Sequence, residues 1–356
     1  MQFGMFYEIQ VPKPWHETKE FETYQQVLDQ VQLADELGFD TFWTVEHHFL
    51  TEFSHCSAPE VLYGAISQRT KRIKIGHGVV LLPFPYNHPI RVAERIAVLD
   101  LLSNGRVNFG TGRSATDIEM GGFGIPPEET RARWEEALQM IPQMWLNETF
   151  SWEGHYFKVP PRQVIPKPRQ KPHPPIWQAC TSAESHEIAG RKGLGLLSFT
   201  FLVDLPELSN RIAAYHRGIK EAKPVGAFVN EQAAVFTLGY CGESKEEARR
   251  TAADNVVWAT KRGLEMAAPL AKVASGDYAY LKQLFGIDIN TITFDYLNDR
   301  DLVIVGDPEE CIRKLKGYQA AGADHILLMQ QVGNIPHEKV LGSIERFAKY
   351  VMPHFK

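Results

Sequence analysis

The sequence predicts an α/β fold, a (β/α)8 TIM barrel with insertions in its loops, and two observations lead to this prediction. Eight short runs of residues are apolar on both faces, as in parallel strands buried between two layers. Helical patterns separate these runs, and such alternation is typical of parallel βαβ units with right-handed crossovers. Eight units close into a barrel that typically takes about 250 residues, so the chain carries roughly 100 residues more than the barrel needs.

The predicted strands are Phe3–Tyr7, Thr41–Val45, Ile73–Val80, Val107–Gly110, Ile176–Ala179, Leu194–Phe199, Ala234–Leu238 and His325–Met329. Five helices between them are marked by apolar residues at helical spacing or by end signals: Tyr24–Leu37 before Gly38, Pro89 to near Gly105, Trp134–Trp145, a helix opened by a capping box of Ser244 with Glu247, and Pro308 to Gly322.

The surplus residues are placed in three loop insertions, 111–126, 147–175 and 263–303. The second holds seven prolines and is expected to lie extended across the surface. The whole chain, 1–356, is therefore predicted to be a single domain. An open doubly wound sheet is the alternative architecture, but no G-x-G-x-x-G follows Phe3, as the dinucleotide-binding form of that fold would require.

Composition narrows the function classes. Lysine and arginine number 38 against 43 acidic residues, a formal charge of −5, so no basic excess favours nucleic acid or an acidic membrane surface. No secretory signal is apparent, and no uncharged apolar run reaches the roughly 18–20 residues of a membrane span. The four cysteines lie far apart and form no C-x-x-C, which suits a cytoplasmic protein without a zinc ribbon or a disulfide framework.

Chemistry in such a barrel sits at the carboxyl ends of the strands, so the residues that follow each strand are the candidates. Glu46, His47 and His48 follow the second strand. A carboxylate beside two histidines suggests a metal site, but neighbouring residues on a strand point to opposite faces, so no shared metal is predicted. Either both histidines are packed structural residues, or one faces the barrel mouth and exchanges protons, since its ordinary pKa is about 6.5.

Two further strand ends are candidates for ligand binding. Glycines 110 and 112 before Arg113 let the backbone approach a ligand closely, and Arg113 offers a cation, although glycine at a strand end is common. The segment Cys180–Ser185 leads into a helix. Thr181 with Glu184 fits a capping box, and the same helix start would also seat a phosphate.

The sequence holds no Walker A loop, no G-x-S-x-G elbow and no H-E-x-x-H pair. A serine hydrolase or a zinc protease of those types therefore has no identifiable apparatus here.

Several blocks of sequence together resemble the luciferase-like flavin monooxygenase family, whose model member is the α subunit of bacterial luciferase. The blocks are Phe3–Phe6, Gly38–Phe49, Thr51–Phe53, Leu82–Pro83 with His88–Pro89, Leu99–Arg106 running into Phe109–Gly110, Val305–Ile312 and Val351–Pro353. They are spread over nearly the whole chain.

The resemblance implies a monooxygenase that uses reduced FMN, FMNH2, as a loosely held cosubstrate, with O2 as the oxidant. A separate flavin reductase would supply the reduced FMN. Oxygen would reach a small organic substrate, such as an aldehyde or a ketone, through a peroxide on flavin atom C4a. The resemblance also implies a homodimer formed through the helices that follow the second and third strands.

The resemblance implies roles for particular residues. His47 would be the catalytic histidine, with Glu46 before it, and Arg113 would lie beside the flavin. Gly78–Val79 would form a non-proline cis peptide against the isoalloxazine ring. The remaining flavin-binding residues would be Gly112 and, around the FMN phosphate, Cys180, Thr181, Ser182 and Ser185. Phe6, Phe49, Phe109 and Trp177 are expected either to line the water-excluding mouth or to belong to the core.

This chain departs from luciferase at three places. Gly112 stands where luciferase has a reactive cysteine, Thr181 stands where it has a glutamate, and 263–303 differs in composition from its long mobile loop. The departures put light emission in question but not flavin binding.

Three alternatives to the flavin monooxygenase stay open: a deazaflavin-dependent hydride-transfer enzyme on the same barrel, a non-catalytic flavin-binding protein, and a metal hydrolase.

Overall fold

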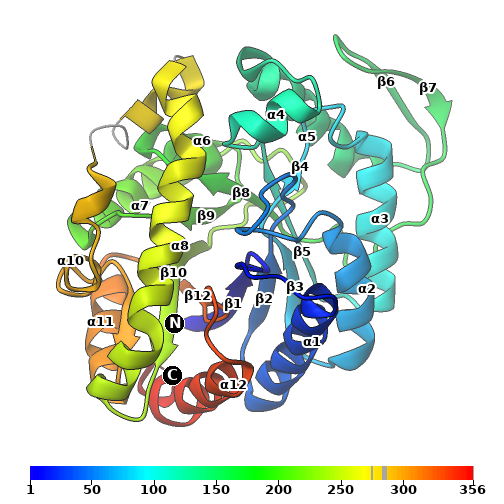
Figure 1. Ribbon diagram of the computed structural model, residues 1–356. Coiled ribbons are helices and arrows are strands. Elements are labelled where there is room, and N and C mark those ends of the chain that lie inside the picture. The colour runs from blue at the N-terminus through cyan, green and yellow to red at the C-terminus, as the bar shows by residue number, and fades with distance from the viewer. Residues whose placement is uncertain (274–275, 283–286, 356) are drawn as a thin grey trace.

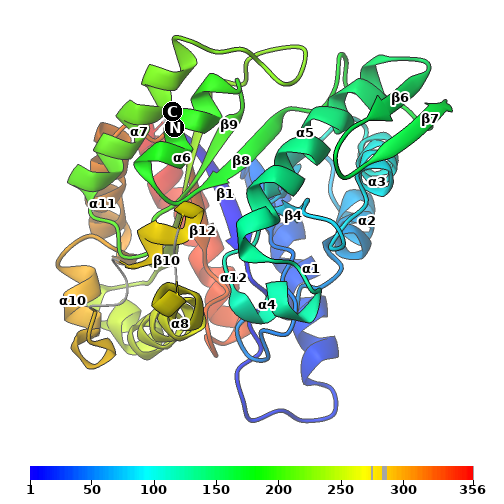
Figure 2. The same ribbon diagram turned by 90° about the horizontal axis from the view of Figure 1, so that it is seen from above.

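A closed barrel of eight parallel strands, surrounded by helices, forms the centre of the molecule (Figures 1 and 2). The computed structural model describes residues 1–273, 276–282 and 287–355. The strands follow the order β1-β2-β3-β5-β8-β9-β10-β12, and β12 pairs with β1 to close the ring. The predicted (β/α)8 barrel is therefore confirmed.

The barrel strands are β1 (Gln2–Tyr7), β2 (Thr41–Thr44), β3 (Lys74–His77), β5 (Val107–Gly112), β8 (Ile176–Cys180), β9 (Gly195–Phe199), β10 (Ala233–Cys241) and β12 (His325–Met329). The helices are α1 (Lys19–Leu37), α2 (Pro59–Arg69), α3 (Pro89–Leu102), α4 (Asp117–Gly122), α5 (Thr130–Leu146), α6 (Ala183–Arg191), α7 (Leu205–Ile219), α8 (Lys245–Val273), α10 (Phe294–Asn298), α11 (Pro308–Ala320) and α12 (His337–Arg346). Short helical turns are η1 (Pro127–Glu129), η2 (Gly276–Leu281), η3 (Ile289–Thr291), η4 (Phe347–Val351) and η5 (Met352–Phe355).

All eight predicted strands exist, but the third is wrong in its second half. The chain leaves β3 after His77, passes through a cis peptide between Gly78 and Val79, and resumes as β4 (Val80–Leu81). In β4, Val80 lies opposite Thr111 of β5, above the part of β5 that pairs with β3. An apolar run cannot reveal such a break, because both halves are buried.

The predicted helices match α1, α3, α5, α8 and α11, and their ends follow local chemistry. Gly38 ends α1 in the left-handed conformation with φ 95°. The backbone N–H of Glu247 donates to Ser244 Oγ at 3.2 Å, as one half of a capping box does. The capping box expected from Thr181 with Glu184 is wrong by one residue. Ser182 caps α6, and its partner is Ser185.

The three predicted insertions differ in content. Residues 111–112 belong to β5, and the rest of 111–126 carries α4. Segment 147–175 contains an antiparallel hairpin of β6 (Phe150–Glu153) and β7 (Lys158–Arg162), which stands at the outer edge beside α3 (Figures 1 and 2). The end of α8 lies inside 263–303, of which residues 274–275 and 283–286 are outside the described residues. A further strand, β11 (Ile304–Gly306), pairs with β10.

Aromatic side chains fill the lower part of the barrel. Trp43 and Trp177 are fully buried, and their ring centroids lie 5.3 Å apart in an edge-on contact. A methyl group at Gly76 would come within 2.2 Å of the Trp43 ring, so glycine is needed where β3 passes this indole. The interior is therefore a packed core, and open space is left at the carboxyl ends of the strands.

No helix in the described part of the chain is long and apolar enough to cross a membrane.

The start of β3 is held by the carboxylate of Asp35 on α1. Its two oxygens accept hydrogen bonds from three successive backbone N–H groups, those of Lys71, Arg72 and Ile73, at 2.7, 2.9 and 2.6 Å. Burial alone would raise the pKa of Asp35, but these N–H donors together with the Arg72 charge lower it below 3.8. One carboxylate thus links the end of α1 to the strand that leads to Gly78.

Replacing Asp35 with Ala is expected to lower the free energy of unfolding by about 1–3 kcal/mol, because it leaves buried N–H donors without an acceptor. Urea denaturation checks this, with Asp29→Ala, an exposed aspartate on the same helix, as the control. Because the folded-state pKa is lowered, the Asp35 contribution is complete above pH 3.8 and is lost as the pH falls further. Equal stabilities of the two variants at pH 7 would contradict this role.

Candidate active site

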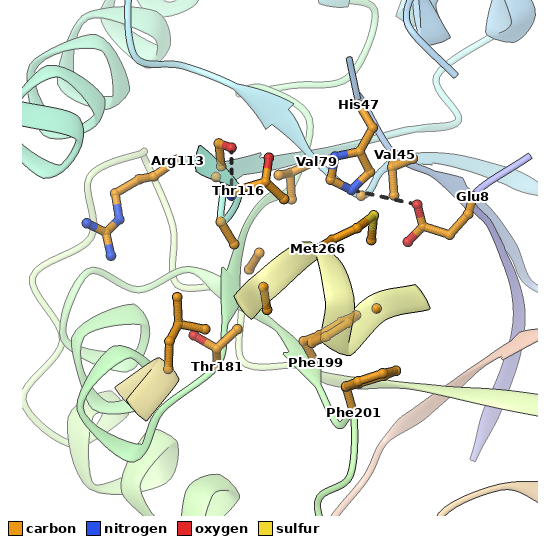
Figure 3. Close-up of a pocket in the computed structure, with 18 of the residues that line it drawn as sticks. Glu8, Val45, His47, Val79, Arg113, Thr116, Thr181, Phe199, Phe201 and Met266 are labelled. Carbon is orange, nitrogen blue, oxygen red and sulfur yellow. Dashed lines mark hydrogen bonds and ion pairs between the residues drawn. The ribbon is translucent and has the colours of Figure 1, made fainter. Parts of the chain in front are cut away.

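A cavity of about 370 Å³ lies at the carboxyl ends of the barrel strands. Its wall comes from the ends of β1, β2, β5, β8 and β9, from the turn at Gly78–Val79, and from the predicted insertions 111–126 and 263–303. In Figure 3, Arg113 and Thr181 lie on one side of it, while His47 and Glu8 lie on the other.

His47 is held between two buried carboxylates. Its Nδ1 lies 2.8 Å from Oε1 of Glu119, and its Nε2 lies 3.6 Å from Oε2 of Glu8. Glu8 follows β1, His47 follows β2, and Glu119 belongs to α4, so three separate elements meet at one ring. The imidazole side chain is 21% exposed and lines the cavity (Figure 3).

Glu119 has its acceptor capacity filled. Besides His47, its Oε1 accepts a hydrogen bond from the backbone N–H of His48 at 2.9 Å. Its Oε2 accepts from the hydroxyls of Ser114, at 3.1 Å, and Thr116. Burial alone would raise the pKa of Glu119, but the His47 charge and these donors lower it to about 2. Glu119 is therefore ionised at neutral pH and fixes the orientation of the His47 ring.

The two carboxylates govern the protonation of His47. Burial alone would lower the pKa of His47, but the charges of Glu119 and Glu8 outweigh burial and raise it to about 9. Burial raises the pKa of Glu8 to about 7, against the attraction of His47. The site therefore holds a protonated imidazole at neutral pH, with one permanently ionised carboxylate and one that titrates near pH 7.

Glu46 and His48 mainly hold the loop beside the site, and the Glu46 charge adds a smaller contribution to the raised pKa of His47. Glu46 Oε2 accepts the backbone N–H of Leu81 at 2.9 Å, and its carboxylate also accepts from the Asn87 side-chain amide at 2.8 Å. His48 Nε2 lies 3.4 Å from Glu46 Oε1. The rings of the adjacent histidines thus contact different carboxylates, and Glu46 lines the cavity as a support of the β4 turn.

The backbone around Gly78 and Val79 forms a closely packed surface of the cavity. The Gly78–Val79 peptide is cis, as the sequence resemblance implied. A methyl group at Gly112 would come within 2.4 Å of Val79 Cγ2, and one at Gly78 within 2.8 Å of the Phe6 ring. Both predicted glycines are therefore required by close approach, and both line the cavity.

Arg113 and Thr181 line the cavity on the side away from His47 (Figure 3). The Arg113 guanidinium lies 5.2 Å from the ring centroid of Tyr278, and its Nη1 is 3.5 Å from Thr130 Oγ1. Tyr278 in turn donates to the carbonyl of Ser114 at 3.2 Å. The segment after α8 therefore packs onto the loop that carries Arg113.

Cys180, Ser182 and Ser185 are not part of the cavity wall. The Cys180 thiol is buried and donates to the Ser185 carbonyl at 3.2 Å. Ser185 Oγ accepts the backbone N–H groups of Thr181 and Ser182, at 3.1 and 3.0 Å. Of the four residues predicted around the phosphate, the structure brings Thr181 to the cavity, and the other three build the start of α6.

Aromatic rings form the apolar wall. Phe199 stacks on Phe236 at 5.3 Å and 6° and on Phe201 at 5.8 Å and 16°. Phe6 lines the cavity as expected, whereas Phe109 and Trp177 are core residues and Phe49 is 53% exposed.

Known proteins resemble this chain over most of its length. The family model of luciferase-like monooxygenases matches residues 1–325. The chain belongs to this family. A relative, the alkanal monooxygenase alpha chain from Photobacterium leiognathi, is 30% identical to this chain, and the match covers 94% of this chain and 95% of the relative. The oxygenase component of the flavin-dependent trigonelline monooxygenase from Acinetobacter baylyi is 24% identical, over 100% and 96%.

Several solved structures share the fold of this chain. Monooxygenase RslO1 from Streptomyces bottropensis has a TM-score of 0.83 at 27% identity, with both chains fully covered. The oxygenating constituent of 3,6-diketocamphane monooxygenase from Pseudomonas putida, solved in complex with FMN, has a TM-score of 0.80 at 21% identity, covering 99% and 98%. An F420-dependent secondary alcohol dehydrogenase has the same barrel at 19% identity and a TM-score of 0.73, covering 99% and 98%.

The cavity of this luciferase-like monooxygenase has the chemistry that a flavin requires. Its volume lies in the range of about 300–1,000 Å³ that is usual for ligand sites. Oε1 of Gln178 is buried in the wall and has no hydrogen-bond partner among the residues that the structure describes, so it is an acceptor that suits a ring with N–H donors. The glycine surface beside Val79 admits a flat group, and Arg113 supplies a cation for an anionic one. The residues that line the cavity therefore fit FMN, the cofactor that the sequence resemblance implied.

The two carboxylates that flank His47, Glu8 and Glu119, were missed by sequence reasoning. Glu8 directly follows the first strand and is the charged residue in an otherwise apolar start, a signal that the rule of reading strand ends would have found. Glu119 lies seven residues beyond the end of β5, on a short helix within an insertion, and no spacing in the sequence points from it to His47.

Within residues 1–273, 276–282 and 287–355, no three histidine, cysteine or acidic side chains are arranged to hold a metal ion. His47 instead contacts Glu119 through Nδ1 at 2.8 Å and lies 3.6 Å from Glu8 through Nε2.

Glu119→Gln is expected to lower the pKa of His47 from about 9 towards its ordinary value of 6.5, because the nearest negative charge is removed. NMR titration of the His47 ring from pH 5 to 10 measures the shift, with the exposed Glu128→Gln as the control. Since the folded-state pKa of His47 is raised, its ion pair with Glu119 stabilises the fold fully below pH 6.5, and this stabilisation is lost as the pH rises through about 9. A wild-type ring that titrates below pH 6.5 would contradict the charge arrangement.

Proposed function

We propose that this chain is the FMN-dependent oxygenase component of a two-component monooxygenase, with residues 1–356 as one barrel domain. It takes reduced FMN from a separate flavin reductase and inserts one atom of O2 into a small organic substrate such as an aldehyde or a ketone. The second oxygen atom leaves as water, and the flavin leaves oxidised, so the two electrons of the reduced flavin balance the reaction. The observation that carries this proposal is the position of His47, which lies between the Glu119 and Glu8 carboxylates and faces the same cavity as the glycine surface at Gly78, Val79 and Gly112.

In this proposal the flavin and the residues that line the cavity have different roles. Bound reduced flavin supplies the electrons that activate O2. His47 holds a proton at Nε2, on the side of the ring that faces the cavity and Glu8. Phe6 and Phe199 keep water away from the reacting atoms, which favours oxygen transfer over release of hydrogen peroxide. Arg113 and Thr181 bind the anionic part of FMN, since both line the cavity on the side away from His47.

Two similar proteins support the separate reductase and the use of FMN in this proposal. The trigonelline enzyme is named as an oxygenase component, which supports a separate reductase. The diketocamphane oxygenase binds FMN on the same barrel.

A homodimer through α2 and α3 is also proposed. Four apolar side chains on these helices are exposed, as expected of a face covered by a second copy: Val61, Val98, Leu101 and Leu102.

The proposed activity is tested by oxygen uptake with reduced FMN across a panel of aldehydes, ketones and aromatic compounds. Oxygen consumption that yields an oxygenated product supports it. Activity with a reduced deazaflavin in the absence of O2, and none with reduced FMN, would contradict it and favour hydride transfer. Tight binding of oxidised FMN without oxygen consumption would favour a flavin-binding protein without catalysis.

His47→Asn is expected to retain FMN binding but to lose oxygenated product, with the oxygen consumed appearing as hydrogen peroxide. Asparagine cannot hold the proton that His47 carries at neutral pH. A peroxide assay run beside product detection measures the coupling between oxygen and product. Unchanged coupling would remove His47 from the proposed mechanism.

Arg113→Ala is expected to weaken the binding of reduced FMN about tenfold or more, since a charge-assisted hydrogen bond contributes about 1.5–3 kcal/mol. Anaerobic fluorescence titration gives the Kd. Arg91→Ala, which removes a 70% exposed arginine side chain on α3, serves as the control and should bind as wild type. An unaltered Kd for Arg113→Ala would place the anionic group elsewhere.

A further inference from the structure

Glu8 differs from the other two carboxylates near His47 in having unused acceptor capacity. Glu119 accepts four hydrogen bonds, and Glu46 is bound by Leu81 and Asn87. Glu8 is 3% exposed, and its Oε2 has no hydrogen-bond partner in the described chain. At 3.6 Å, His47 Nε2 is near enough to attract this oxygen but too far to hydrogen-bond to it.

The balance of charges around His47 also singles out Glu8. A single imidazolium faces both Glu8 and Glu119, and its short contact, 2.8 Å, is made with Glu119. An ionised Glu8 therefore lacks a full counter-charge, and a buried carboxylate without hydrogen-bond donors is costly. A donor that enters the cavity and reaches Glu8 would remove this cost, so the empty site favours ligands that bring one.

The surroundings of Glu8 indicate what carries that donor. Phe199 and Phe201 present stacked rings to the cavity, and Met266 of α8 lies between them and the His47–Glu8 pair (Figure 3). Phe201 is in turn fixed by α8, since a methyl group at Gly263 would come within 2.7 Å of its ring. Flat aromatic faces beside a thioether favour a ring-shaped apolar body.

The position of Glu8 also separates it from the proposed flavin-binding side. Arg113 and Thr181 lie across the cavity from Glu8, with Val79 between them and His47 (Figure 3). A flavin held by Arg113 and the glycine surface leaves the Glu8 side of the cavity for the substrate. This step rests on the proposed function.

We propose that Glu8 is the polar anchor of the substrate, accepting a hydrogen bond from a hydroxyl or N–H group on an aromatic substrate whose ring lies against Phe199 and Phe201. The anchor places the ring beside His47, where the proposed oxygen transfer takes place. The substrate class is therefore donor-bearing aromatic compounds, phenols and aromatic amines, in preference to the same rings with the donor blocked. Glu8 touches the substrate in this arrangement, whereas Glu119 acts through His47.

A matched pair of ligands tests the proposal. The probes are 4-ethylphenol and its methyl ether, 4-ethylanisole, which share a ring and differ in the O–H donor. Each is titrated at pH 8 into the flavin-free protein carrying ¹³C-methyl methionine, and the Met266 methyl shift reports occupancy of the cavity. Wild type should bind the phenol about tenfold or more tightly than the ether, because a hydrogen bond to a charged acceptor contributes about 1.5–3 kcal/mol.

Variants at position 8 test whether Glu8 causes the preference for the phenol over the ether. Glu8→Leu should abolish the preference for the phenol, and Glu128→Leu, at an exposed carboxylate, should keep it. Should Glu8→Leu fail to fold, Glu8→Gln carries the test, since a neutral amide is a weaker acceptor and should reduce the preference at least about threefold. Equal affinities in wild type, an unchanged preference in the Glu8 variants, or no Met266 shift with either probe would each overturn the proposal.

The titration contains neither flavin nor oxygen. Its failure would leave the flavin-dependent activity standing with a different substrate class, whereas failure of oxygen uptake with bound phenol would count against the activity itself.

Discussion

One protonated imidazole placed between two buried carboxylates is the constraint on which the site depends. Carboxylates this deeply buried need a cation or hydrogen-bond donors, and His47 supplies the cation for both Glu8 and Glu119. The arrangement is unequal, because Glu119 is saturated with donors while Glu8 keeps an oxygen free. The saturated side fixes the ring, and the unsaturated side faces the cavity. In the proposed function, proton supply and substrate recognition therefore share the Nε2 edge of the imidazole, while the Nδ1 edge is held by Glu119.

The barrel brings these groups together from distant parts of the chain. Residues at the ends of β1 and β2 meet because parallel strands of a closed barrel all end at the same face. Glu119 arrives differently, on α4, and the hydroxyls of Ser114 and Thr116 just before this helix donate to its carboxylate. The α8 helix closes the far side with Gly263 and Met266. The scaffold thus fixes the acid–base groups, while inserted segments complete their partners and shape the space for a ligand.

The sequence allowed the barrel, its eight strands and the position of His47 to be predicted, because buried parallel strands and strand-end residues leave local signals. The break after His77 left none, since its apolar residues are buried on either side of it. Ser182 and Ser185 illustrate a second limit: their hydroxyls suit a phosphate in the sequence, but in the fold they satisfy each other and the start of α6. Glu119 shows a third, because the distance along the chain between an insertion and a strand end carries no information about contact.

The division of the cavity into a flavin side and a substrate side is tested most directly by a crystal structure with reduced FMN bound under anaerobic conditions. The isoalloxazine ring should lie against Val79 and Gly112, with the anionic end towards Arg113, while Glu8 and His47 still border open space. A ring seated away from residues 47 and 113, or one that fills the space beside Glu8, would contradict the arrangement.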